Sequence, residues 1–137
     1  MGLKTNNCFM IESLTSLLAD NEHLYSPFYG CLVPEGFFKT AYDLRFGFFG
    51  RTDPDLLIAL LSPLNGKKIM WTIRVPLDIK EVKIKKSFIM KQYIVKLFFN
   101  EGNPCKIRFS KKLLIGDFIN QNQNVTEFLY YLEQYIK

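Results

Sequence analysis

Only a few residues of this sequence have the types that catalytic or metal chemistry requires, and their spacing does not bring them together. Cys8, Cys31 and Cys105 are an odd number of cysteines without a C-x-x-C pair, which argues against a zinc ribbon and a closed disulfide framework. His23 is the only histidine, and no adjacent cysteine, serine nucleophile or second histidine accompanies it. We therefore predict no metal site and no cofactor.

Paired carboxylates are the remaining candidates for acid and base chemistry. Asp53 and Asp55 flank Pro54, a pattern that is typical of a turn in which Asp accepts backbone hydrogen bonds. Asp43 and Arg45 alternate along an expected strand, where their charges are solvated. No glycine-rich phosphate loop, H-E-x-x-H or G-x-S-x-G motif occurs. We predict that the chain is not an enzyme.

Positive charge concentrates in one part of the chain. The formal net charge is +5, yet the segment 67–112 has a net charge of +10 and the remainder −5. The basic residues of that segment are Lys67, Lys68, Arg74, Lys80, Lys83, Lys85, Lys86, Lys91, Lys96, Lys106, Arg108, Lys111 and Lys112. A polarised molecule can attract an anionic partner, although exposed lysines on strands also keep a sheet soluble. The sequence leaves both explanations open.

Five of these residues form the candidate binding surface, because they alternate with apolar residues along three expected strands. They are Lys83, Lys85, Lys106, Arg108 and Arg74. Anionic lipid headgroups and an acidic protein or peptide are the partners that such a surface would attract. Nucleic acid is disfavoured, because 14 lysines against 4 arginines is a poor match to phosphate and base recognition.

Two helices are expected to frame the strands that carry these residues. Residues 9–20 place Met10, Leu14, Leu17 and Leu18 at helical spacing, which predicts a short amphipathic helix. Residues 124–137 begin with Asn124 as an N-cap and Glu127 three positions later, a capping-box pattern. The apolar stripe of this second helix, which must lie on the sheet, is Val125, Phe128, Leu129, Leu132 and Ile136.

Between these helices, residues 23–112 have a period of two and turn signals about every ten residues, which predicts an antiparallel meander. We expect turns at 53–55, at Asn65-Gly66 and at 100–103. Residues of each strand that share a face are assigned to the core, and the alternating residues face solvent. The core set includes Ile69, Trp71, Ile73, Val75, Val82, Ile84, Tyr93, Phe98, Phe99, Cys105, Ile107 and Phe109.

Two segments within this pattern resemble the pleckstrin-homology-like superfold, particularly its small bacterial and GRAM-type members. The segment 48–53, FFGRTD, followed by LLIA at 56–59, is similar to a G-x-T-x-x-R-L-L entry into a strand. The segment 73–82, IRVPLDIKEV, looks like an I-P-l-x-d-I-x-x-V segment. The resemblance implies a mainly β fold with α: a partly open antiparallel barrel of about seven strands, a short N-terminal helix and a C-terminal capping helix.

The sequence, which shows no linker or repeat, thus predicts a single domain over 1–137 that acts as a non-catalytic binding module. The module would associate with a protein or peptide, or with an anionic membrane surface, through a basic sheet face. We expect a cytoplasmic protein, since no secretory or membrane-spanning segment is recognised; it would lie peripheral to the membrane if lipid is the partner. One alternative is a closed barrel or helix-grip fold that carries a small apolar molecule. Another is a homo-oligomer in which an edge strand or the first helix pairs with its copy.

Overall fold

The computed structural model describes residues 6–33, 45–62, 68–87, 91–113 and 118–136. Its elements are α1 (Asn6–Thr15), β1 (Tyr25–Val33), β2 (Arg45–Arg51), β3 (Asp55–Leu61), β4 (Ile69–Pro76), β5 (Ile79–Ser87), β6 (Gln92–Phe99), β7 (Cys105–Ser110) and α2 (Gln121–Glu133). The order of one helix, seven strands and one helix confirms the predicted fold class.

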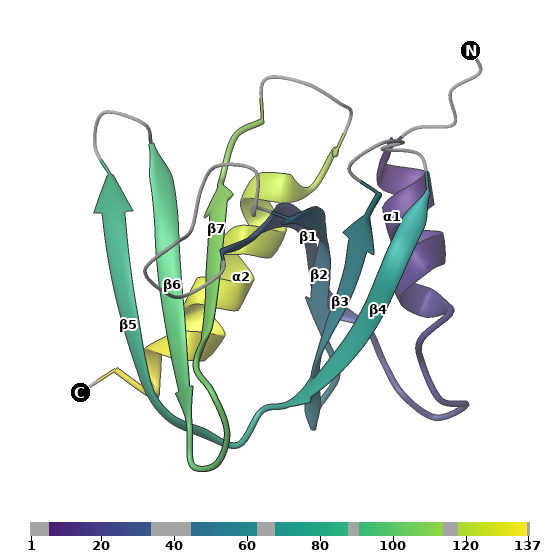
Figure 1. Ribbon diagram of the computed structural model, residues 1–137. Helices are drawn as coiled ribbons and strands as arrows, with labels where there is room; N and C mark the ends of the chain where they lie inside the picture. Colours follow the sequence, from purple (N-terminus) through teal and green to yellow (C-terminus); the bar gives the residue numbers. More distant parts are fainter. Residues whose placement is uncertain (1–5, 34–44, 63–67, 88–90, 114–117, 137) are drawn as a thin grey trace.

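The seven strands form one antiparallel sheet that remains open. Its hydrogen-bonded order is β4-β3-β2-β1-β7-β6-β5, so β4 and β5 are the edges of the described sheet. The sheet bends into two halves, β1–β4 and β5–β7; the edge strands meet where the chain passes from β4 to β5 and separate toward their other ends (Figure 1). The partly open barrel is therefore confirmed, and the described sheet gives no support to the alternative of a closed barrel or helix-grip fold.

Aromatic and aliphatic side chains fill the space between the two halves. The ring centroid of Phe28 lies 5.4 Å from that of Phe49, 4.9 Å from that of Phe109 and 5.0 Å from that of Phe128. Phe128 and Leu132 of α2 are fully buried in this cluster. Helix α2 thus closes one end of the fold, as its apolar stripe predicts.

The start of α2 differs from the capping-box prediction. The helix begins at Gln121, and the side chain of Asn120, the residue before it, makes no capping hydrogen bond. Asn124 lies inside the helix, and its Nδ2 donates to the carbonyl oxygen of Pro27 at 2.7 Å. The predicted cap at Asn124 is wrong because this side chain bonds to the segment that it packs against. Ile136 follows the end of the helix and is exposed rather than part of the apolar stripe.

The first helix also begins and ends earlier than its apolar pattern suggests. It covers Asn6–Thr15 rather than 9–20. Met10 and Leu14 are fully buried against the outer face of β2 and β3, whereas Leu17 follows the helix and is partly buried in the same cluster. Helix α1 therefore covers the face of the sheet that is turned away from α2.

Two of the three predicted turns are confirmed. The turn at 53–55 joins β2 to β3, and the amide of Asp55 donates to Oγ1 of Thr52 at 3.0 Å. The turn at 100–103 joins β6 to β7 and places Gly102 at φ +93°, which a glycine adopts without strain. The turn at Asn65-Gly66 lies outside the described residues, but β3 and β4 pair as expected.

Strand β4 does not have the buried face that its alternation predicts. Ile73 lies opposite Ile58, and Trp71 lies opposite Leu60, so both occupy the inner face of the sheet. Nevertheless 56% of the Trp71 surface and 36% of the Ile73 surface are exposed. The prediction of core positions is wrong for Trp71 and Ile73, because β4 is an edge strand of the described sheet. Val75 packs against the core cluster as predicted, whereas Ile69 packs against the cluster under α1.

Candidate anion-binding face

A row of lysines crosses the outer face of β5, β6 and β7. Lys83 lies opposite Lys96, and Lys96 lies opposite Lys106. Residues directly opposite each other in an antiparallel sheet carry their side chains on the same face. The neighbouring residues Val95 and Ile107 are fully buried, so the three lysines face away from the core.

A second row lies two residues farther along each strand. Lys85 lies opposite Ile94, and Ile94 lies opposite Arg108. The two rows together form a surface, here named the basic ladder, that consists of Lys83, Lys85, Lys96, Lys106 and Arg108. Four of the five predicted binding residues are therefore brought onto one face.

Lys96 and Phe98 also lie on this outer face, although neither is among the five predicted binding residues. Phe98 was expected in the core, but it follows Lys96 by two positions and lies on the same outer face. The Nζ atoms of Lys83 and Lys96 lie 5.6 Å and 5.2 Å from the centroid of the Phe98 ring. At these distances the ring face attracts both ammonium groups. The alternation of β6, in which Val95 and Leu97 are buried, is the signal that identifies both residues.

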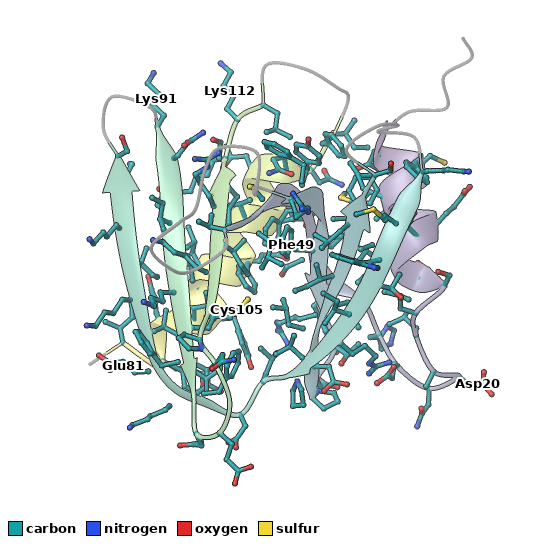
Figure 2. The ribbon with its side chains drawn as sticks, viewed as in Figure 1. Asp20, Phe49, Glu81, Lys91, Cys105 and Lys112 are labelled. Carbon is teal, nitrogen blue, oxygen red and sulfur yellow. The ribbon has the colours of Figure 1, made fainter. Side chains whose placement is uncertain are left out.

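Positive charge continues beyond the ladder at one end of the same half of the sheet. Lys91 and Lys112 extend from the ends of β6 and β7 that lie away from the β6–β7 turn (Figure 2). The Nζ atoms of Lys86 and Lys111 lie 5.5 Å and 5.4 Å from the centroid of the Tyr93 ring, which is partly buried. Lysines therefore surround this aromatic ring as well.

Acidic residues are sparse around the ladder. Glu81 lies opposite Phe98 and extends from the other end of β5 (Figure 2). In the part of the chain that the structure describes, Lys83, Lys85 and Lys106 form no ion pair with a carboxylate. Their charges are thus not neutralised within the described chain.

The cysteines do not contribute a reactive group to this face. Cys31 of β1 is buried opposite Arg108, and burial raises the pKa of its thiol although the nearby guanidinium opposes this shift. Burial raises the pKa of Cys105 to about 11. Both thiols remain protonated at neutral pH, as expected for small hydrophobic residues.

Arg74, the fifth predicted site residue, lies elsewhere. It lies opposite Leu57, a residue of the cluster under α1, on the face of β4 away from the core between the halves. Its guanidinium donates to Glu22 at 2.9 Å and 2.7 Å and to Asp55 at 3.0 Å and 2.6 Å. The hydrogen bonds from Arg74 to Glu22, together with one from the backbone amide of Ala19, lower the pKa of Glu22 to about 2. Two carboxylates therefore surround Arg74, and it does not belong to the basic ladder.

The described residues contain no group of three or more His, Cys, Asp or Glu side chains that could hold a metal ion. Of the two described helices, neither is long and apolar enough to cross a membrane.

Comparison with known proteins identifies the fold. No protein-family model matches the sequence, and no curated protein matches it. The structure is similar to the hSac2 domain of the human phosphoinositide phosphatase Sac2, with a TM-score of 0.57 and 14% identity over 90% of this chain and 78% of that chain. It is also similar to a pleckstrin homology domain from Shewanella amazonensis, with a TM-score of 0.50 and 16% identity over 95% and 97% of the two chains.

A third similar structure, a protein with a pleckstrin-homology domain from Shewanella loihica, has a TM-score of 0.50 and 14% identity over 95% of this chain and 92% of that chain. Identities this low carry information on the fold and none on the ligand. Together with the bent seven-stranded sheet and the capping helix, they show that this chain has a pleckstrin-homology-like fold.

Proposed function

We propose that this chain is a non-catalytic binding module whose basic ladder associates peripherally with the surface of an anionic membrane. The observation that carries this proposal is the alignment of Lys83, Lys96 and Lys106 at matched positions of three neighbouring strands. Lys85 and Arg108 add two further cations on the same face. The pleckstrin-homology-like fold is compatible with a binding role, but it does not specify the partner.

The spacing of the ladder makes its charges act together. Neighbouring strands lie about 4.8 Å apart, so the row from Lys83 to Lys106 spans roughly 10 Å of backbone. This distance is comparable with the Debye length of about 8 Å at physiological ionic strength. An anionic surface would therefore meet the five cations as one patch rather than as separate charges.

The residue types favour a lipid surface over an acidic peptide. Four of the five cations are lysines, whose ammonium groups act as point charges on flexible stems, whereas arginine suits the bidentate recognition of single carboxylates. Phe98 lies among these lysines on the same face, and an aromatic ring can enter the headgroup region beside them.

The test is co-sedimentation with phosphatidylcholine vesicles, with and without phosphatidylserine. Each lysine near an anionic surface contributes about 1 kcal/mol, so the five cations supply at most about 5 kcal/mol, and binding should weaken steeply with added salt. Lys106→Glu removes one attraction and adds one repulsion, which should lower the binding constant roughly 10- to 30-fold. Lys83→Glu should act similarly.

Lys68→Glu is the matched control, because it changes the net charge equally but lies just before β4, in the other half of the sheet. We expect this control to bind within about threefold of wild type. Equal losses in Lys106→Glu and Lys68→Glu would show that net charge alone is responsible and would refute the ladder as the site. Failure of the wild type to bind phosphatidylserine vesicles, with retained binding of an acidic peptide, would refute the membrane as the partner.

A further inference from the structure

The two edges of the sheet differ in how they are protected from pairing with another strand. An edge strand presents unpaired backbone N–H and C=O groups, and charged side chains commonly prevent it from binding a second edge. The edge strand β5 contains four lysines, namely Lys80, Lys83, Lys85 and Lys86. In addition, the amide of Val82 donates to the carbonyl oxygen of Tyr135, at 3.2 Å, just beyond α2. Both features disfavour self-association through β5.

Strand β4 has neither form of protection among the described residues. Its sequence from Ile69 to Pro76 contains a single charged residue, Arg74, which Glu22 and Asp55 neutralise within the same chain. Its two large inner-face residues, Trp71 and Ile73, are the exposed ones described above. An apolar edge of this kind is suited to strand pairing.

A groove of about 610 Å³ adjoins the inner face of β4. It lies between the two halves of the sheet, and its lining includes Ile58, Ile73, Val75 and Cys105 together with Lys96 and Lys106 of the basic ladder. Cys105 marks this position on β7 (Figure 2). Because Ile73 and Val75 belong both to the groove and to the edge strand, a strand that pairs with β4 would place its own inner-face side chains over the groove.

We propose that β4 pairs with β4 of a second copy of this chain, antiparallel, about a two-fold axis that passes through Thr72 or Ile73. This axis is perpendicular to the sheet, so the inner faces of both copies lie on the same side of the joined sheet. The residue through which the axis passes lies opposite the same residue of the other copy. Trp71 of one copy then lies opposite Ile73 of the other when the axis is at Thr72, and opposite Val75 when it is at Ile73. Each indole therefore covers the groove of the other copy.

The electrostatics of β4 permit this arrangement. In the two registers Arg74 lies opposite Met70 or Thr72 of the second copy, so no two arginines face each other. Pairing of β5 with its own copy would bring lysines together, which is unfavourable. Strand β4 thus has no unpaired charge and also has exposed apolar side chains. A second copy of β4 is complementary to it in backbone hydrogen bonding, charge and hydrophobicity.

Trp71 is the only tryptophan of the chain and lies at the centre of the proposed interface, so it reports directly on pairing. Sedimentation velocity should show a particle of twice the chain mass that dissociates on dilution. The tryptophan emission should shift to longer wavelength over the same concentration range, as the indole becomes exposed. Ile73→Lys should weaken association by about 100-fold or more, because two unpaired charges would face the interface. It retains Trp71 as the probe.

Tyr130→Lys is the control: it also introduces a lysine at an exposed large side chain, but on α2. We expect this variant to dissociate as the wild type does, and circular dichroism should show both variants folded. A wild type that stays monomeric at the highest soluble concentration would overturn the proposal. So would a dimer that Ile73→Lys leaves intact, or a tryptophan emission that does not change as the dimer dissociates.

Discussion

Replacing Gln121 by alanine tests how much the hydrogen bonds of this side chain, which connect α2 to the sheet, contribute to stability. This glutamine is 4% exposed, and its Oε1 accepts a hydrogen bond from the amide of Tyr29 at 3.0 Å. Its Nε2 donates to the carbonyl oxygens of Tyr29 and Ser110 at 3.0 Å and 2.9 Å. Strand β1 pairs with β7 only over residues 31–33 of β1. Beyond this pairing, the side-chain amide of Gln121 supplies the hydrogen bonds that a neighbouring strand would otherwise make to the backbone of Tyr29.

The expected loss of stability follows from these three hydrogen bonds. A typical intramolecular hydrogen bond contributes about 0.5–1.5 kcal/mol net, and a buried donor left without a partner costs about 1–3 kcal/mol. Water that enters the vacated space will offset part of this penalty. We therefore expect Gln121→Ala to lower the free energy of unfolding by about 2–4 kcal/mol, a large share of the typical 5–15 kcal/mol.

Urea unfolding followed by circular dichroism measures this change. The midpoint should fall while the slope of free energy against urea stays constant, since the folded structure buries nearly the same surface. Gln123→Ala is the matched control, because Gln123 lies in the same helical turn but is exposed; its effect should stay below about 0.5 kcal/mol. If the two variants lose equal stability, the bridging role of Gln121 is wrong and the effect is one of helix composition.

Two further changes test the core and the ion pairs. Phe128→Ala should destabilise the protein by about 3–5 kcal/mol in urea, because the ring is fully buried, whereas Tyr130→Ala, at 76% exposure, should change stability by less than about 0.5 kcal/mol; a small effect at Phe128 would refute the capping role of α2. Glu22→Gln tests the lowered carboxylate pKa: the stabilisation is complete above the usual pKa of 4.5 and is lost as the pH falls toward about 2. The urea midpoints of this variant and the wild type should therefore differ at pH 6 and converge as the pH approaches 2; a difference independent of pH would exclude the Arg74 ion pair as the cause.

The alternation of residues predicts the faces of the strands but not what covers them. In β5 and β7 the pattern places Lys83, Lys85, Lys106 and Arg108 on the outer face as observed, because both strands pack their other face on the shared core. In β4 the same kind of pattern fails for Trp71. Burial of an inner face depends on the position of the strand in the sheet order, and a sequence period carries no information about that order.

Local helix signals failed at α2 for a related reason. Asn124 and Glu127 have the spacing of a capping box, but a cap competes with every other partner that the fold offers to the same side chain. Asn124 bonds to Pro27, and the helix starts one turn earlier, where Gln121 reaches β1 and β7. The partners of Gln121 and Asn124 in β1 are more than 90 residues away in the sequence, so no local pattern could have indicated them.

Edge protection does not account for all of the ladder lysines. Lysines protect a sheet edge, and those of β5 can be explained in this way. Lys96 and Lys106 lie on β6 and β7, which pair on both sides and have no edge to protect. Like charges directly opposite each other repel, and the ladder places Lys83 opposite Lys96 and Lys96 opposite Lys106. In the function proposed above, an anionic membrane surface would relieve this repulsion when it binds the ladder.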